Sequence, residues 1–354
     1  MLGSLIEEAI SKKGEILDQI SEYDYKDLNL DKYWKDKTIP LSEDSPVIGA
    51  GDGSFNKKRF ISFYLYAVAA ESLIHNPNTD EGLTNIESSN VGGIPHQSRL
   101  DDRLSNFMNI MELKNSIKCL KNRDLDYYLF DGSIYGDLVW LFPRSELSAN
   151  DKRELLAKYL APMKELLFDE NIPIASKFLL DKESVHFKNY DDYRFLESVE
   201  KTLLLTELLK ENKRIVAISK TSSATDLLNW NIPDIALFNF YSKKEGYSRI
   251  YRPEPFKRDF NIDNGFLKSI DFTVFYARLA PFKSVLKFEL PYKASEEDCV
   301  KVLSDLKKDS IDGYPYLLHK AHHDVVISNK DMDALSNIVD VVERQGREML
   351  WIVL

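Results

Sequence analysis

The chain has 354 residues, 44% of them hydrophobic, and 57 acidic against 47 basic residues give a formal net charge of −10. This composition allows a large buried core and argues against broad nonspecific attraction to nucleic acid. The longest apolar run, residues 63–70, is far shorter than the roughly 18 residues that cross a bilayer, and charged residues stand where a signal peptide would be apolar. We therefore expect a cytoplasmic protein with no membrane association. The distant cysteines Cys119 and Cys299 favour neither a disulfide framework nor a thiolate metal site.

The first predicted element is an amphipathic helix over residues 1–22, where apolar residues recur at helical spacing. Residues 45–54 and 59–72 are predicted to form two antiparallel strands joined by the Gly-Ser-Phe-Asn-Lys-Lys segment. Residues 76–102 are polar, rich in Asn, Gly, Pro and Ser, and without periodicity, so we expect a mobile or functional loop. A helix is predicted over residues 103–122.

The rest of the chain mixes predicted strands and helices. A strand is predicted to end at Asp131. Residues 331–354 are predicted to form a C-terminal helix followed by a short apolar tail, MLWIVL. No internal repeat or composition break requires a second domain, so we expect one mixed α/β domain over residues 1–354. Further helices are predicted near residues 150–170, 191–212, 295–308 and 331–348, and further strands at residues 214–220, 271–279 and 284–292.

The triplet Asp-Gly-Ser occurs twice, at residues 52–54 and 131–133, each time after an apolar stretch. Aspartate-glycine between apolar runs is the usual sequence of a tight turn, and turn formation explains either triplet taken alone. The alternative places Asp52 and Asp131 at the carboxyl ends of two strands, where α/β sheets tend to bind ligands.

Glu112, in the middle of the predicted helix at 103–122, supplies a third carboxylate. Acids on a strand, a helix and a later strand outline a site for Mg²⁺ or Mn²⁺, which prefer oxygen ligands. Two such ions about 4 Å apart can activate water and stabilise the leaving oxygen in phosphodiester cleavage. A surface glutamate is the alternative for Glu112. Taken together, the three acids predict a metal-dependent phosphoryl-transfer enzyme.

Residues 312–328 contain Tyr314 and three histidines, His319, His322 and His323, which share one face if this stretch is helical. A zinc site is one interpretation, although no further ligand is evident. Surface histidines are a second. A histidine that lies near the carboxylates and contacts a metal or a phosphate is the third.

Positive charge and aromatic residues interleave at residues 241–258, although the chain as a whole is acidic. Cations for phosphates and rings for bases are what single-strand binding requires. A solvated loop with partly packed aromatic residues explains the stretch equally well. Its candidate DNA-binding residues are Lys243, Lys244, Arg249, Arg252, Lys257 and Arg258.

Short motifs along nearly the whole chain resemble those of the NurA nucleases, which work with the HerA translocase in DNA-end processing. In order they are GAGDGSF from residue 49, MEL from 111, YYLFDGS from 127, AISKTS from 217, FYARLAPFKSVLKFELP from 275 and GYPYLLHKAH from 313. Their order and spacing carry the resemblance.

The resemblance implies a ribonuclease-H-like fold, with a mixed sheet flanked by helices, an N-terminal helix and long insertions. It also implies a homodimer and a manganese-dependent nuclease, with magnesium as an alternative and two ions expected, acting on single- and double-stranded DNA. The implied modes are 5′-to-3′ exonuclease and single-strand endonuclease, in DNA double-strand break end resection and homologous recombination with a HerA-type hexameric ATPase.

Carried over by position, Asp52, Glu112 and Asp131 look like the metal-binding acids. Tyr314 and His322 look like the late tyrosine and histidine of the active centre, with His322 as a further metal ligand.

Three more residues enter through the resemblance. Lys220 is a candidate for phosphate contact, with a plain strand-end lysine as the alternative. Glu71 and Glu87 are possible substitutes for Glu112, because only MEL within a helix marks that position.

Two other functions remain open at this point. A phosphotransferase of the actin-like fold also uses Asp-Gly-Ser turns, but it should carry a Gly-rich adenosine-binding segment in its C-terminal half. A catalytically inactive DNA-end-binding scaffold is the non-enzymatic alternative. No P-loop sequence occurs, so ATP hydrolysis is expected to belong to a partner. The tail at residues 349–354 is expected either to dock on a partner or to pack in the core.

Overall fold

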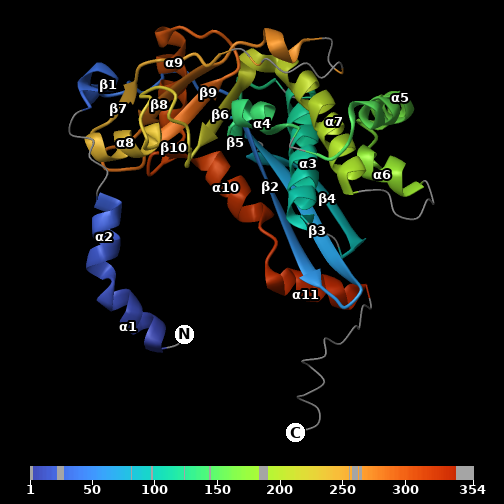
Figure 1. Cartoon of the computed structure of the whole chain (residues 1–354). Coiled ribbons are helices and arrows are strands. Elements are labelled where there is room, and N and C mark those ends of the chain that lie inside the picture. Colours follow the sequence, from blue (N-terminus) through green and yellow to red (C-terminus); the bar gives the residue numbers. More distant parts are fainter. Residues whose placement is uncertain are drawn as a thin grey trace.

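A single large sheet organises the fold. The computed structural model describes residues 3–21, 28–80, 82–96, 99–122, 124–142, 145–182, 190–254, 256, 262 and 265–339. Within these residues the sheet has the strand order β1-β7-β8-β9-β6-β5-β2-β3-β4 (Figure 1). The strands are β1 (Trp34–Asp36), β2 (Ile48–Arg59), β3 (Phe63–His75), β4 (Leu83–Pro95), β5 (Tyr127–Asp131), β6 (Ile215–Ser219), β7 (Gly246–Ser248), β8 (Thr273–Arg278) and β9 (Leu286–Leu290), with a separate pair, β10 (Ser310–Ile311) and β11 (Tyr314–Pro315).

Strand direction changes around β5. β2, β3 and β4 form an antiparallel meander, β5 lies parallel to β2, and β6 lies parallel to β5. β9, β8, β7 and β1 continue the sheet in antiparallel fashion. The pairing of β2 with β5 ends at Gly51 and Phe130, so from Asp52 onward no described strand flanks that edge of β2. We call this opening the β2–β5 fork.

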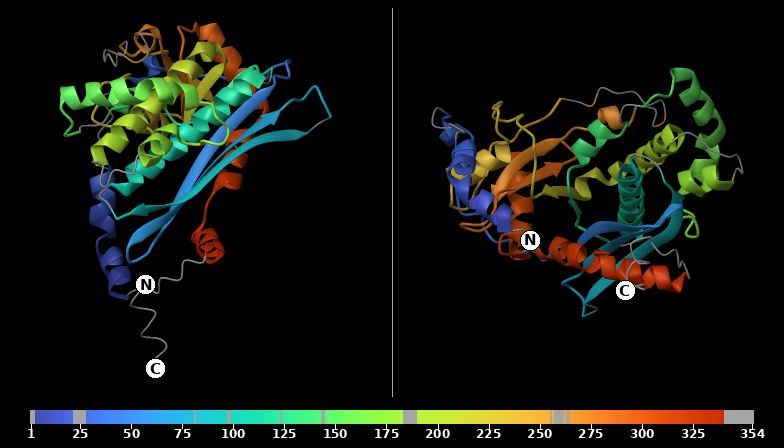
Figure 2. Two further views of the ribbon diagram at one scale, coloured as in Figure 1. Left: turned by 90° about the vertical axis from the view of Figure 1, so that its right-hand side faces the viewer. Right: turned by 60° about the horizontal axis from the view of Figure 1, so that its bottom comes forward.

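Helices cover both faces of the sheet, and Figure 2 shows α3 and α10 on opposite sides of it. One hydrophobic core, which includes Phe107 and Val199, lies on the side of α3 and α7. A second core, which includes Leu303 and Leu317, lies on the side of α9 and α10. The helices are α1 (Gly3–Ser11), α2 (Lys13–Ser21), α3 (Leu100–Asn122), α4 (Ile134–Trp140), α5 (Ala149–Leu166), α6 (Ala175–Lys182), α7 (Tyr190–Leu208), α8 (Asp234–Tyr241), α9 (Glu296–Lys308), α10 (Tyr316–Val325) and α11 (Asn329–Ile338).

β2 and β3 are antiparallel as predicted, but the predicted connection between them is wrong. β2 continues to Arg59, so the Gly-Ser-Phe-Asn-Lys-Lys segment is strand and the connection lies at residues 60–62. Side-chain alternation explains this extension, because Phe55 packs toward the α3 core while Asn56 donates to the Ile327 carbonyl at 3.0 Å on the other face. Asp52 therefore lies within a strand.

The loop predicted over residues 76–102 is also wrong. Residues 83–95 form β4, which pairs with β3 along its whole length, and α3 already begins at Leu100. β4 is the outer strand of the described sheet, and its alternate residues are exposed. The sequence of β4 is polar because one face of the strand meets solvent. Backbone hydrogen bonds to β3 form the strand, and an apolar periodicity that would have predicted it is missing.

The remaining predicted elements are found with adjusted bounds. The N-terminal helix is divided into α1 and α2. The helices α4, α6 and α8 and the short strands β1 and β7 were not predicted. The C-terminal helix ends at Ile338, while residues 340–354, which include the apolar tail, lie outside the described residues. None of the described helices is long and apolar enough to cross a membrane.

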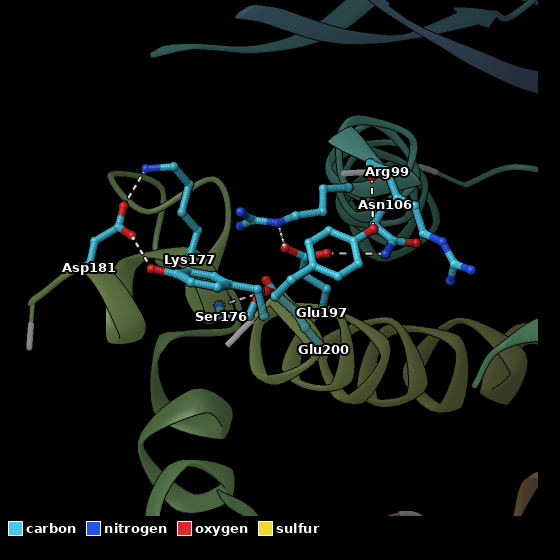
Figure 3. Close-up of polar contacts among 10 residues, drawn as sticks. Arg99, Asn106, Ser176, Lys177, Asp181, Glu197 and Glu200 are labelled. Carbon is cyan, nitrogen blue, oxygen red and sulfur yellow. Dashed lines mark hydrogen bonds and ion pairs between the residues drawn. The ribbon is translucent and has the colours of Figure 1, made fainter. Parts of the chain in front are cut away.

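Buried charged side chains join α3, α6 and α7 (Figure 3). Arg103 Nε donates to Glu197 Oε1 at 2.7 Å, and Asn106 Nδ2 donates to the other oxygen of that carboxylate at 3.2 Å. Glu200 accepts backbone N–H groups of the first two residues of α6 at 2.9 and 2.8 Å. A carboxylate at a helix N-terminus satisfies donors that the helix itself leaves free. This network fixes the position of α3, which carries Glu112.

Candidate active site

Three predicted site residues meet at the β2–β5 fork. Asp52, Asp131 and His322 each offer one ligand atom, and these atoms lie within 4.8 Å of one another. Among the described residues, they form the one group of three or more His, Cys, Asp and Glu side chains close enough to share a metal ion. His322 Nδ1 lies 2.6 Å from Asp52 Oδ2. The fork thus collects side chains from β2, β5 and α10.

Asp52 projects toward α10 because it shares its side of β2 with Ile48 and Ala50, which are buried in the core beneath α9 and α10. Burial raises the pKa of Asp52, and the charge of Asp131 adds to this. Hydrogen bonds from the His322 ring and from the Gly53 amide, at 2.8 Å, act in the opposite direction. A cation at the fork would stabilise the ionised carboxylate further.

Asp131 ends β5, as predicted, and its carboxylate has two partners. Lys220 Nζ donates to Asp131 Oδ2 at 2.9 Å, and the Tyr314 hydroxyl donates to the same oxygen at 3.2 Å. The Lys220 ammonium also lies 4.5 Å from the centroid of the Tyr314 ring. Burial and the Asp131 charge raise the pKa of Tyr314, so the phenol stays protonated and acts as a donor. The structure therefore brings Lys220 and Tyr314 to the fork with the aspartates.

Glu112 approaches the fork from the α3 side, at Gly53, but it is not one of the three side chains whose ligand atoms lie within 4.8 Å of one another. A Cβ atom placed on Gly53 would collide with Glu112 Oε1 and lie 2.6 Å from Met108 Cγ, so α3 crosses β2 closely at this glycine. Burial and the neighbouring carboxylates, Asp52 first, raise the pKa of Glu112 to about 8. A carboxyl group in such surroundings is stabilised either by protonation or by a cation beside it.

The glycines of the two Asp-Gly-Ser triplets have different roles. Gly132 has φ +137°, a left-handed value that a turn requires and that glycine tolerates. Gly53 lies within β2 and is instead needed because the side chain of Glu112 occupies the space of a Cβ. The turn interpretation therefore holds after Asp131 and is wrong after Asp52.

The proposed substitutes for Glu112 lie on the neighbouring strands β3 and β4. Glu71 is directly opposite Asp52 on β3, and Glu87 is opposite Glu71 on β4. Asn85 Nδ2 donates to Glu71 at 3.3 Å, and burial raises the pKa of Glu71. Asp52 and Asp131 both raise the pKa of Glu112, whereas the charges that act on Glu71 are those of other residues.

A buried pair on β9 supports the turn after Asp131, and the sequence analysis missed it. Ser133 Oγ donates to Glu289 Oε1 at 2.5 Å, and the Tyr135 amide donates to Glu289 Oε2 at 3.0 Å. Lys287 Nζ lies 2.7 Å from Glu289 Oε1, and both side chains are buried. The available signal was the presence of two charged residues in the strand LKFEL, since buried charges need partners.

Of the three histidines, only His322 joins the carboxylates. His319 and His323 are exposed, and His323 Nδ1 lies 3.7 Å from Asp324. Since the ligand cluster of the described residues contains one histidine, the zinc interpretation has no further ligands to support it.

The basic stretch at 241–258 differs from the prediction in its aromatic residues. Tyr247 and Phe256 are buried in the cores and cannot stack on bases. Lys244 lies 3.4 Å from Asp36. Four of the six basic residues are described, namely Lys243, Lys244, Arg249 and Arg252, while Lys257 and Arg258 lie outside the described residues.

Comparison with known proteins decides the family. The model of the NurA domain matches residues 46–327. The chain belongs to the NurA family. It is 32% identical over 326 residues to the "Probable DNA double-strand break repair nuclease NurA" of Methanocaldococcus jannaschii, covering 85% of this chain and 80% of that protein. It is 27% identical to the DNA double-strand break repair nuclease NurA of Sulfurisphaera tokodaii, covering 97% of each chain.

Solved NurA structures have the same fold. The NurA nuclease from Sulfolobus solfataricus superposes with a TM-score of 0.75 at 22% identity, covering 96% of this chain and 97% of that chain. A NurA structure bound to dAMP and manganese superposes with a TM-score of 0.68 at 18% identity, covering 99% and 100%. The ribonuclease-H-like fold is confirmed. As a NurA protein, the chain is a nuclease, and therefore a hydrolase.

Gly53→Ala is expected to lower nuclease activity by about 100-fold, because the new methyl group displaces Glu112 and the helix that carries it. Overpacking should also cost about 1–3 kcal/mol in the free energy of unfolding. Gly93→Ala on β4 is the matched control, since its Cβ would make ordinary contacts at 3.4 Å with Phe63. Cleavage assays and chemical denaturation measure both effects. Wild-type behaviour of Gly53→Ala would contradict the close crossing of α3.

Glu112→Gln is expected to stabilise the metal-free protein at pH 8. The pKa of Glu112 is about 8 in the folded protein against an ordinary value of 4.5. The unfolded chain therefore loses this proton first, and stability falls as the pH rises from about 5 toward 8. Glutamine carries no charge at either pH. The melting temperature of the Glu112→Gln protein in chelator should therefore exceed that of wild type by about 2–4 °C at pH 8 and match it at pH 5. An equal difference at both pH values would contradict this assignment.

Proposed function

We propose that this NurA protein is a metal-dependent deoxyribonuclease that hydrolyses phosphodiester bonds at the β2–β5 fork. The observation that carries the proposal is the meeting of Asp52, Asp131 and His322 within 4.8 Å, with Glu112 against the adjacent Gly53. Its expected role is end resection at DNA double-strand breaks, with 5′-to-3′ exonuclease and single-strand endonuclease modes. The family assignment replaces the actin-like phosphotransferase alternative.

The residues at the fork fit manganese or magnesium. Asp52 and Asp131 offer carboxylate oxygens and His322 offers a ring nitrogen, a donor set that suits these ions. Glu112, which lies outside this group and approaches from the α3 side at Gly53, is proposed as a further ligand. A related NurA structure contains manganese. We propose two ions, which when bound activate water and stabilise the leaving oxygen.

The protein's own groups orient this site. Lys220 and Tyr314 hold Asp131 Oδ2 through hydrogen bonds, which fixes the carboxylate at the end of β5. The Lys220 side chain is 42% exposed, so its ammonium can also contact a phosphate oxygen of the substrate. The His322 side chain is 58% exposed and hydrogen-bonded to Asp52, which leaves its second ring nitrogen available for a ligand or a proton.

We propose that the chain acts as a homodimer that receives single- and double-stranded DNA from a HerA-type hexameric ATPase. The lack of a P-loop supports a separate motor. α1 has no buried residue, and Ile6 and Ile10, which share one face at i and i+4, are 48% and 70% exposed, so this helix offers an apolar face to a second copy.

Cleavage of end-labelled single-stranded and duplex DNA tests the function. We expect products with manganese, and with magnesium at a different rate, and none with chelator. Products from labels at the 5′ and 3′ ends report the direction of digestion. Tight DNA binding without metal-dependent cleavage, with or without a HerA motor, would favour the inactive scaffold.

A further inference from the structure

The loop between β8 and β9 presents an aromatic ring to solvent. Phe282 is 82% exposed, and its φ of +64° lies in the left-handed region that bulky residues avoid. The Phe282 amide donates to the Lys243 carbonyl at 2.8 Å, and Lys283 Nζ lies 2.9 Å from Asp312 Oδ1. The backbone conformation opposes stability, and residues held in such conformations cluster at sites where a protein binds or acts on something.

Positive charge surrounds this ring. Phe282 lines an open groove of about 610 Å³ together with Lys37, Lys243 and Lys244. Of the two acids that line the groove, Glu245 is neutralised by Lys307 at 2.6 Å, and Asp36 faces Lys244 at 3.4 Å. The groove therefore attracts anions although the whole chain is acidic.

A buried cation near the groove adds to its charge. Arg278 is 2% exposed, and its Nη2 donates to the carbonyl of Ser242, a residue of the groove, at 2.6 Å. Its Nε has no hydrogen-bond partner among the described residues. No carboxylate of the described residues forms an ion pair with this guanidinium.

The loop packs against the turn that carries Tyr314. A Cβ atom placed on Gly313 would lie 3.1 Å from Lys283 Cβ, and Gly313 directly precedes Tyr314. With about 3.8 Å between consecutive Cα atoms, the Cα atoms of Phe282 and Tyr314 are within about 15 Å of each other. Tyr314 in turn donates to Asp131 at the fork. The ring is thus a few nucleotides from the proposed site of cleavage.

We infer that Phe282 stacks on a base of single-stranded DNA that leads to the fork, while Lys243 and Lys244 contact the backbone phosphates. This inference rests on the proposed function. A free ring beside cations matches the requirements of single-strand binding, whereas the bases of a duplex are already stacked on one another.

Fluorescence anisotropy with a labelled oligothymidylate in chelator tests this contact. Phe282→Ala is expected to weaken binding by about 5- to 100-fold, and Phe282→Trp to retain it. The slope of log affinity against log salt should stay unchanged in Phe282→Ala, whereas Lys243→Ala and Lys244→Ala should each lower it by about 0.7. A 2-aminopurine base should be quenched by wild type and not by Phe282→Ala. Phe178→Ala on α6 is the matched control, since Phe178 is also exposed at 40%.

The outcomes separate the inference from the proposed function. If wild type cleaves DNA but Phe282→Ala binds the single strand as tightly as wild type, the stacking role is overturned and the nuclease stands. If Phe282→Ala loses only self-association or binding to a partner protein, the surface belongs to a protein interface and the inference is overturned. A wild-type chain that neither binds nor cleaves DNA would overturn both proposals.

Discussion

Asparagine in place of Asp52 or Asp131 should lower metal-dependent cleavage by about 1,000-fold or more. Each substitution removes a negative charge from the cluster that also contains His322, and these three side chains are within 4.8 Å of one another. The asparagine side chain keeps an oxygen that accepts hydrogen bonds. In Asp52→Asn it can still accept from the backbone N–H of Gly53, and in Asp131→Asn from the Tyr314 hydroxyl, so the local structure should survive. Cleavage rates and calorimetric titration with manganese measure the loss.

Asp333→Asn is a suitable control for these variants. Its carboxylate is 66% exposed and pairs with Lys58 at 2.8 Å, away from the fork. Removing an exposed pair changes stability little, and cleavage should stay at the wild-type level. If Asp52→Asn and Asp131→Asn fold and still cleave at the rate of this control, the fork is not the metal site.

Breaking the buried Arg103–Glu197 pair should have the largest effect on stability. The side chains of Arg103 and Glu197 are 4% and 0% exposed, and they are 2.7 Å apart. Arg103→Met leaves a buried carboxylate without its cation, which costs about 3–5 kcal/mol in the free energy of unfolding. The substitution also removes the stacking of the guanidinium over the Tyr193 ring at 4.1 Å. Chemical denaturation at neutral pH measures this loss.

The double variant Arg103→Met/Glu197→Leu tests the cause. It has no buried charge left at this position, so it should recover much of the stability that Arg103→Met loses. A double variant that loses the sum of the two single losses would show that packing, and not the uncompensated charge, dominates. Because α3 carries Glu112, the single variant should also cleave more slowly below its melting temperature.

The sequence predicted those parts of the fold whose residues carry a strong local pattern. The apolar run before Asp131 identified β5 and placed this acid at a strand end, and the periodicity of residues 103–122 identified α3. β4 was missed because an edge strand with one solvated face has a polar sequence. The full length of β2 was missed because the second half of this strand contains mostly polar residues, and so has no apolar run that would predict a strand.

The candidate site was predictable in its acids and less so in what supports them. Asp52, Asp131 and His322 come together as the resemblance implied, whereas Glu112, implied with them, lies outside their group on the α3 side of β2. The role of Gly53 was misassigned, because an Asp-Gly pair in a sequence does not show whether a helix crosses above it. The Glu289–Lys287 pair depends on contact between β9 and α4, elements about 150 residues apart in the chain, and local patterns carry no information about such contacts.

The β2–β5 fork has a consequence for the protein during its synthesis. Glu112 approaches from one face of the sheet and His322 from the other, so both layers must be packed before the proposed site is complete. His322 and Tyr314 are also among the last described residues to leave the ribosome. A partly synthesised chain, or one in which either helical layer has detached, therefore has the two aspartates but not the complete site. We therefore expect the protein to cleave no DNA until the whole molecule has folded.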